Sequence, residues 1–427
     1  MPAFILSHSQ LRQRILFGLL FVLGVVYLVF EYDHVGDFLV YYQASQNLFL
    51  SKNIYAEGYG EMHVLPYYGS PSLAFLLGPF TLLPFPIAAM AWKICSLFFL
   101  YRTWLLIESY FDIQALSPRE YIWFILISFF SVSFVLYRNF TLNQFTVFLL
   151  YVILEGLHLV VDKKKDFLGA NLIGLGIVCK MLPLVTIPYF VYRGYRKAAL
   201  FTILCTLFWV FFPLVFLGWE NGSLLLQEWL HTINPNQERH VFDVTTNDIH
   251  GLPAFIPILF IEDLGFDQYT LTLRRHIVNL DPQVVKIILH IVRGFFIAFA
   301  LYFLRSHIFQ KETRPQWQLW ELGYILTITP LIFPQQRLYA FYFLFPAIAY
   351  LTYHIIKYNR ERLESSGPVP FLFYVYATSI LIFNLELILG HFREYYWHFK
   401  TVTYSVFVFL YVYAATPPSS ISSPKII

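Results

Sequence analysis

The chain has 427 residues, of which 58% are hydrophobic and only 13% carry a charge. About a quarter of the residues of a typical soluble domain are charged, so this composition excludes an ordinary soluble protein and indicates one embedded in a membrane. The formal net charge of +3 gives no support for nucleic-acid binding.

The first apolar segment begins after Arg12 and Arg14 and runs to about Phe30. It is longer than the apolar part of a usual signal peptide, and no small-residue cleavage site follows it. We therefore expect residues 14–31 to form an uncleaved first membrane span.

Further spans are predicted wherever an apolar run approaches the roughly 20 residues that cross the hydrocarbon core as a helix. The candidates are 14–31, 85–107, 120–137, 144–161, 198–217, 283–305, 318–333, 338–356, 369–389 and 401–416. The apolar segment 167–193 is interrupted by Lys180 and Pro183, and we interpret it as two short or tilted helices that meet near Lys180.

These segments predict an all-α, polytopic transmembrane helical bundle of about 12 spans, within a range of roughly 10 to 13. We assign residues 1–416 to a single membrane-embedded domain. The Pro/Ser-rich residues 417–427 are predicted to be a disordered tail.

The positions of the charges predict the orientation, because short cytoplasmic loops are enriched in Lys and Arg. With the N-terminus inside, the inside segments hold Arg12, Arg14, Lys163, Lys164, Lys165, Arg193, Arg196, Lys197, Arg305, Lys311, Arg314, Lys357, Arg360 and Arg362. The loops 32–83 and 218–282 fall outside, and the acids concentrate in their first parts. We expect both termini to be cytoplasmic, in a multi-pass protein of a bacterial plasma (inner) membrane.

This orientation requires that residues 71–83 do not cross. That segment contains Pro71, Gly78 and Pro79 and is short for a span, so we expect helices that lie in the membrane interface or re-enter it.

An amphipathic helix is predicted to begin at about Asp37 in the first outside loop. Its apolar side would carry Phe38, Tyr41, Tyr42, Leu48 and Phe49, opposite Gln43, Gln46 and Asn47. Asp37 allows two interpretations: a helix cap beside the N-terminal partial charge, or a general base that an acceptor hydroxyl could reach. The local pattern alone favours the cap.

Lys180 and Arg337 are the candidate cationic residues. A charge within an apolar segment is costly and points to function, although Lys180 at a helix end could instead extend to the interface. Arg337 lies between two spans on the predicted outside face, where its planar guanidinium suits a phosphate or acts as an interfacial anchor.

The second outside loop carries His231, His240, Asp243, Asp248 and His250. No two of the histidines have the i, i+4 spacing of a helical zinc site. We expect a solvated loop and no metal site.

Several short motifs, taken in order, resemble a known family. Residues 36–44 read Gly-Asp-Phe-Leu-Val-Tyr-Tyr-Gln-Ala and are followed by Asn-Ile-Tyr at 53–55 and by an aromatic-proline segment at 66–74. A Gly-rich stretch, 168–177, then leads to Lys180-Met181-Leu182-Pro183. Together these resemble the polyprenyl-phosphate-mannose-dependent mannosyltransferases of glycosyltransferase family 87, which have the GT-C fold.

Two other motifs of that family are only partly present. Gln144 remains from Gly-Gln-x-Asn, with Asn143 and Thr146 in place of the glycine and the asparagine. The late Ser-Pro-x-x-x-His segment corresponds to residues 330–337, where the histidine is absent and Arg337 is present.

The resemblance implies a membrane glycosyltransferase that moves a hexose, mannose by analogy, from a polyprenyl-phosphate sugar to a lipid or glycan hydroxyl on the extracytoplasmic face, with inversion. It assigns Asp37 as the general base. Arg337 and Lys180 are the candidates for holding the phosphate, and Gln144, Tyr41 and Tyr55 are further substrate-binding candidates. No cofactor or metal is expected, and the expected partners are membrane lipids, the donor and the acceptor, without nucleic acid.

Two alternatives remain at this point. A lipid or polysaccharide transporter would need a polar path at the membrane midplane and usually symmetric halves, and no internal repeat is visible. A polysaccharide polymerase or ligase would be expected to use Arg or His in late loops rather than an early Asp.

Overall fold

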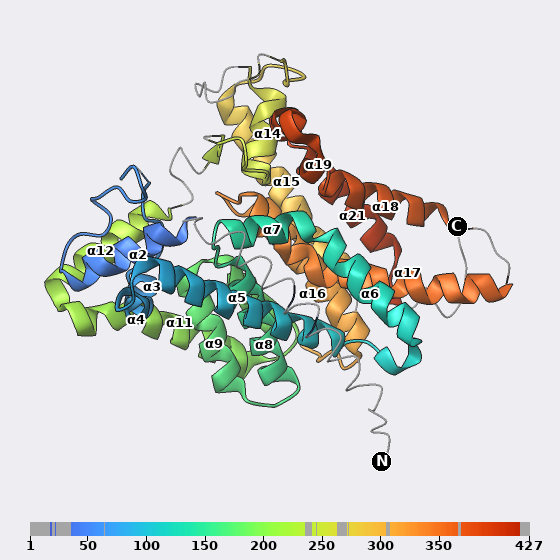
Figure 1. The fold of residues 1–427 in the computed structure, drawn as a ribbon, viewed down its shortest axis with the longest axis horizontal. Helices are drawn as coiled ribbons and strands as arrows, with labels where there is room; N and C mark the ends of the chain where they lie inside the picture. Colours follow the sequence, from blue (N-terminus) through green and yellow to red (C-terminus); the bar gives the residue numbers. More distant parts are fainter. Residues whose placement is uncertain are drawn as a thin grey trace.

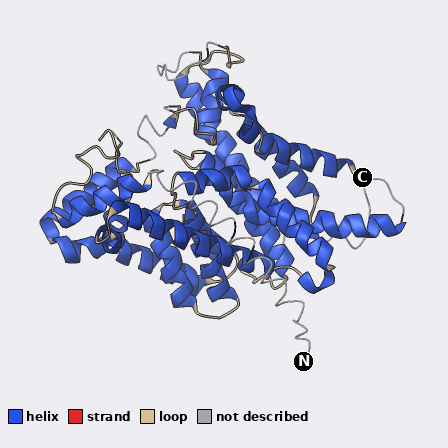
Figure 2. Ribbon diagram, viewed as in Figure 1, coloured by secondary structure: helices blue, strands red, loops and turns tan. Residues whose placement is uncertain are grey.

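The computed structural model describes residues 36–63, 65–234, 241–244, 246–262, 271, 273–304, 308–365 and 369–418, together with Gly18 and Val22. All regular elements in these ranges are helices, which confirms the all-α class for this part of the chain (Figure 2). The predicted first span, 14–31, lies outside the described residues except for Gly18 and Val22. The predicted tail lies outside them from residue 419 onward.

The helices follow the predicted segments closely. In the first half they are α2 (Phe38–Phe49), α3 (Pro71–Leu76), α4 (Gly78–Thr81), α5 (Phe85–Glu108), η1 (Ile113–Ala115), α6 (Pro118–Ser131), α7 (Ser133–Thr141), α8 (Thr146–Val161), α9 (Asp166–Cys179), η2 (Leu182–Val185), α10 (Thr186–Tyr192) and α11 (Arg196–Leu217). In the second half they are α12 (Trp219–Thr232), α14 (Leu252–Phe260), α15 (Pro282–Phe303), α16 (Pro315–Ile332), η3 (Leu338–Leu344), α17 (Phe345–Ser365), α18 (Phe371–Phe383), α19 (Glu386–Leu389), η4 (Gly390–Phe392), α20 (Arg393–His398) and α21 (Thr401–Ala415).

The predicted count of about 12 spans is not confirmed. Among the described residues, 4 helical segments are long and apolar enough to cross a membrane, and up to 6 if each of two bent pairs counts as one span. The pairs are α6 with α7, bent by 59°, and α18 with residues 386–398, bent by 53°. Several other apolar segments form helices too short to pass the same criterion, because the chain breaks within them.

Helix breaks near Lys180 and within residues 71–83 agree with the prediction. Lys180 ends α9 in an extended conformation, and Pro183 then lies in the short helix η2. Residues 71–83 form α3 and α4, which break at Leu77 and are each far shorter than a span.

The helices are arranged so that distant parts of the sequence meet. In Figure 1, α2, α3, α4 and α12 gather at one end of the molecule and α17, α18 and α21 at the other. Between them, α8, α9 and α11 pack side by side and α5 lies against α8. The helix α16 packs against both α15 and α17.

Aromatic packing fixes α2 in place. The Phe38 ring is fully buried and stacks on the Trp92 ring of α5, with 5.8 Å between centroids. The Tyr42 hydroxyl donates to the Leu83 carbonyl at 2.9 Å, and the Ser45 hydroxyl to the Ala74 carbonyl at 2.7 Å. The helix begins where the sequence predicted, but Phe49, expected on its apolar side, is 43% exposed.

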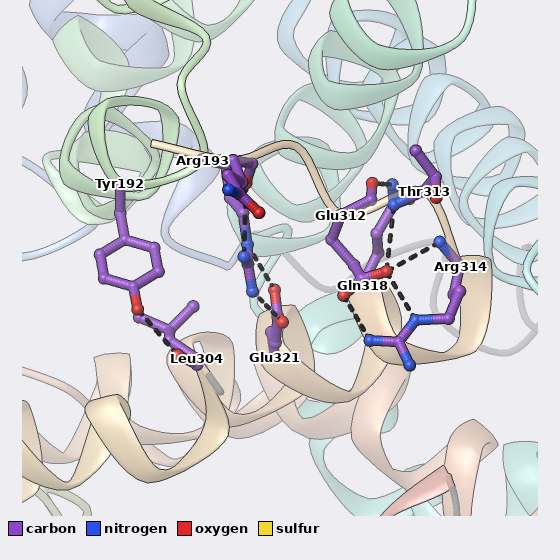
Figure 3. A network of polar contacts seen from close by, with 9 residues as sticks. Tyr192, Arg193, Leu304, Glu312, Thr313, Arg314, Gln318 and Glu321 are labelled. Carbon is purple, nitrogen blue, oxygen red and sulfur yellow. Dashed lines mark hydrogen bonds and ion pairs between the residues drawn. The ribbon is translucent and has the colours of Figure 1, made fainter. Parts of the chain in front are cut away.

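A buried ion pair joins α16 to the turn between α10 and α11 (Figure 3). Arg193 is fully buried, and its Nε donates to Glu321 Oε2 at 2.9 Å, while its Nη2 pairs with Glu321 Oε1. Beside this pair, the more exposed Arg314 binds Glu312 through two nitrogens, at 2.9 and 2.8 Å. Two charges without access to water must neutralise each other, so this pair fixes the relative position of the two segments.

We expect Glu321→Gln to lower the free energy of unfolding by about 3 to 5 kcal/mol, because it leaves the buried Arg193 guanidinium without a countercharge. Thermal unfolding in detergent measures this. Replacing both partners with methionine should recover most of the loss, and Lys52→Gln, at the exposed Lys52–Glu57 pair, should change little. An unchanged melting temperature for Glu321→Gln would contradict this account.

Candidate active site

The backbone at Gly36 and Asp37 lies directly against the turn between α7 and α8. The Asp37 N–H donates to the Leu142 carbonyl at 2.9 Å. Gly36 has φ +58°, and a Cβ on it would lie 2.8 Å from the Leu142 carbonyl carbon. Only glycine tolerates both the left-handed backbone and this close approach, so Gly36 allows Asp37 to reach the α7–α8 turn.

The Asp37 side chain bonds across this contact and not along its own helix. Gln144 Nε2 donates to Asp37 Oδ2 at 2.6 Å. Asp37 occupies the N-cap position of α2, but its carboxylate accepts no hydrogen bond from that helix. The interpretation of Asp37 as a side-chain cap, which the local sequence favoured, is therefore wrong. A carboxylate held by one amide keeps acceptor capacity for a further proton donor.

Arg337 reaches the same place from the far half of the chain. Residues 248–250 and 336–338 pair as a short antiparallel bridge, with Leu338 N–H donating to the Asp248 carbonyl at 3.0 Å. This bridge brings Arg337 Nε to 3.7 Å from Asp248 Oδ2. Asp243 supports the turn before it, because its carboxylate accepts a hydrogen bond from the Gln335 N–H.

Lys180 stands at the break between α9 and η2. Its Nζ lies 4.9 Å from the centroid of the Tyr339 ring, a cation–π contact. It also lies within electrostatic range of Asp37 and Arg337. The break in the apolar segment therefore places the lysine beside the other charged residues, as a candidate site residue.

The two tyrosines differ in their distance from this cluster. The Tyr41 ring packs on Phe145 at 4.8 Å, and Tyr41 interacts electrostatically with both Asp37 and Arg337. Tyr55 donates its hydroxyl to the Gly69 carbonyl at 2.8 Å, and the Tyr67 ring lies between it and Tyr41, in contact with both rings. Tyr41 thus belongs to the cluster, whereas Tyr55 lies one ring beyond it.

Burial raises the pKa of the Asp37 carboxyl above its ordinary value. The Arg337 charge and the Gln144 hydrogen bond act in the opposite direction, and the Asp248 charge adds to the rise. Burial likewise raises the pKa of Asp243 to about 7, although the Gln335 N–H and Lys400 oppose it. A carboxylate with a raised pKa is a stronger base than an exposed one.

The prediction of a solvated loop at 218–251 is wrong for most of the residues that the structure describes there. Residues 219–232 form α12, and Asp243 and His250 are buried, with 1% and 0% of their surface exposed. Asp248 and Asp243 were not predicted as site residues. The acids in this loop were visible in the sequence, but nothing local indicates that they pair with residues 335–338.

Lys400 is a further residue that the sequence did not single out. It is fully buried, has φ +51° and donates from Nζ to the Asn247 carbonyl at 2.9 Å. It therefore holds the backbone next to Asp248. In the parts of the chain that the structure describes, no three His, Cys, Asp or Glu side chains are grouped to hold a metal ion.

We expect Gly36→Ala to reduce any activity that depends on Asp37, because the new Cβ would push residues 36–37 away from the α7–α8 turn and break the bond to Gln144. Gly218→Ala is the matched control, since Gly218 also has a positive φ, +77°, but a Cβ there meets nothing within 4 Å. Both variants should lose about 1 to 3 kcal/mol of stability from backbone strain, measured by thermal unfolding. Equal activity in the two variants would show that the close approach is unimportant.

Comparison with known proteins identifies the family. Searches of curated proteins and of solved structures each gave no match. The sequence model of glycosyltransferase family 87 matches residues 67–334, a range that holds Gln144 and Lys180 but neither Asp37 nor Arg337. Because this match covers more than half of a chain rich in apolar helices, the chain belongs to glycosyltransferase family 87, a family of membrane glycosyltransferases.

Proposed function

We propose that this protein transfers a hexose, with mannose as the expected sugar, from a polyprenyl-phosphate donor to a hydroxyl of a lipid or glycan on the extracytoplasmic face of the membrane. Asp37 is the general base, and the anomeric centre is inverted. Membership in a glycosyltransferase family favours this over the transporter and the polymerase.

The observation that carries the proposal is the convergence of Asp37, Gln144, Lys180 and Arg337. These residues come from four separate parts of the chain and lie in one charged cluster. A reaction that expels a phosphate needs a base for the incoming hydroxyl and cations for the departing oxygen. The cluster contains both.

The reaction forms a bond between the acceptor oxygen and the anomeric carbon while the bond from that carbon to the phosphate oxygen breaks. The acceptor proton passes to an Asp37 carboxylate oxygen, and the electron pair of the broken bond stays on the lipid phosphate. Arg337 offers a planar pair of donors to that phosphate, and Lys180 offers a compact charge.

The geometry around Arg337 suits a ligand that arrives and leaves. Its contact with Asp248 spans 3.7 Å, longer than a charge-assisted hydrogen bond, and 37% of its side-chain surface is exposed. Arg337 can therefore exchange part of this interaction for a phosphate oxygen.

We expect Asp37→Asn to reduce the transfer rate from polyprenyl-phosphate mannose by about 10²- to 10⁴-fold, the usual contribution of a general base. The folded-state pKa of Asp37 lies above its ordinary value, so the ionised carboxylate at neutral pH destabilises the fold. The variant should thus melt at an equal or higher temperature, whereas loss of a purely structural carboxylate would lower it.

The matched control is Glu57→Gln, which removes a half-exposed acid from the same loop. Its transfer rate should stay within about twofold of the wild type, as for most surface changes. Labelled donor incubated with membranes, followed by product identification, measures both variants. Wild-type transfer by Asp37→Asn would refute its role as the base.

The pH profile gives a second test, with opposite signs in two variants. The base must be ionised, so the rate falls as the pH drops through the pKa of Asp37. The Gln144 hydrogen bond lowers that pKa and the Asp248 charge raises it. Gln144→Ala should therefore move the acid limb of kcat/KM to higher pH, and Asp248→Asn should move it to lower pH. Shifts in the same direction would exclude Asp37 as the titrating group.

A further inference from the structure

The helix α15 has one face that is open to its surroundings and one that is buried. The open face carries Val284, Ile287, Ile291 and Phe295, whose exposed fractions run from 45% to 65%. Val285 and Leu289 are fully buried on the other side, where α14 and α16 pack. The helix α15 is long and apolar enough to span a membrane. Of the four described helical segments that are, it has the smallest fraction of buried residues, so its open face suits lipid.

A row of basic side chains runs along one flank between these faces. Lys286, His290 and Arg293 stand at i, i+4 and i+7 and therefore share one side of the helix. With about 100° of rotation per residue, this side lies next to the buried residues and turns toward the open face.

Arg293 is the deepest member of the row. It stands eleven residues after Pro282, about 17 Å along the helix axis and near the middle of a hydrocarbon core about 30 Å thick. An arginine at that depth costs about 2.5 to 3.5 kcal/mol on insertion scales, and it is too far from either surface to extend easily into water. Such a residue is expected to have a specific anionic partner.

Within the described residues, the hydrogen-bonding capacity of Arg293 is only partly used. Its Nε is buried and has no hydrogen-bond partner there. Asp243 is the acid that acts on it electrostatically, but the Arg293 Nε donates no hydrogen bond to that carboxylate. Arg293 therefore keeps donor capacity for another anion.

Asp243 also connects the row to the candidate active site. Its own N–H donates to the Pro253 carbonyl in α14, at 3.0 Å, and α14 lies beside α15 (Figure 1). Through Gln335 it supports the turn that carries Arg337. The basic flank of α15 thus begins near the predicted outside end of the helix, and its member Arg293 is linked through Asp243 to the turn that carries Arg337.

We propose that the flank of α15 formed by Lys286, His290 and Arg293 binds the phosphate of an isoprenoid-phosphate lipid as that lipid moves between the bilayer and Arg337. The proposal rests on the proposed function, since it supplies the lateral route that such a donor and its spent product need. The chemistry fits both parts of the lipid: the cations bind the phosphate, and the adjacent apolar face accommodates the chain.

The test measures binding of decaprenyl phosphate, which carries no sugar, to the full-length protein in detergent by native mass spectrometry. Phosphatidylglycerol and inorganic phosphate form parallel arms. Arg293→Gln should weaken binding of decaprenyl phosphate at least about tenfold, the equivalent of one charge-assisted hydrogen bond. Arg293→Lys should fall between it and the wild type, because the charge remains and the planar fork is lost.

Lys357→Gln, which removes one positive charge from α17, is the control and should bind like the wild type. If Arg293→Gln does not fold, His290→Gln replaces it, since this side chain is exposed and nearer the helix end. His290→Gln should weaken binding about threefold.

Equal binding of decaprenyl phosphate by the wild type and the variant would overturn the proposal. Equal weakening for phosphatidylglycerol would also overturn it, because the row would then be a general lipid anchor. Displacement of decaprenyl phosphate by an equal concentration of inorganic phosphate would overturn the proposal as well. Failure of wild-type membranes to transfer a hexose would refute the proposed function alone. Because decaprenyl phosphate has no sugar to transfer, its Arg293-dependent binding would still support the route along α15.

Discussion

Charges inside this apolar molecule must be balanced locally, and the arrangement of the helices follows from that requirement. Two groups of charges within the described residues illustrate this. Arg193 and Glu321 form one, and the cluster of Asp37, Arg337, Asp248 and Lys180 forms the other. Each joins parts of the chain that are far apart in sequence.

The two groups are balanced in different ways. Arg193 and Glu321 have at most 1% of their side chains exposed and bind through two pairs of atoms, which leaves no place for a ligand. Arg337 and Asp248 meet at 3.7 Å with 37% and 24% exposed. The tight pair maintains the structure, while the looser one retains unused hydrogen-bonding capacity. That contrast supports the proposal that Arg337 binds a phosphate.

Local sequence patterns predicted where helices begin and break better than they predicted how long each helix is. The start of α2 at Asp37 and the break at Lys180 followed from amphipathic spacing and from a charge and a proline in an apolar run. The span count is not confirmed, in part because bends such as that at Val132 lie within an apolar segment that has no proline or glycine. Those bends arise from packing between distant helices, which a single sequence does not display.

The candidate site was predictable only in part, for a similar reason. Gln144 and the role of Asp37 as a base came from a family resemblance, whereas local pattern alone made Asp37 a cap. Lys180 and Arg337 were already candidates from the placement of their charges. Asp248 was missed because its role depends on the backbone bridge to residues 336–338, which unites two loops nearly ninety residues apart. Long-range backbone pairing of this kind has no local sequence signature.

The helix α16 connects the two charged groups, with Glu321 near its beginning and the Arg337 turn just beyond its end. The stretch from Glu321 to Ile332 is about 17 Å long, and the Arg193 pair holds the end of it that lies away from the Arg337 turn. A tilt of about 5° around that pair would carry the far end by about 1.5 Å, enough to lengthen or close a hydrogen bond to a substrate. The position of the Arg337 turn therefore depends partly on the Arg193–Glu321 pair, which lies near the opposite end of α16.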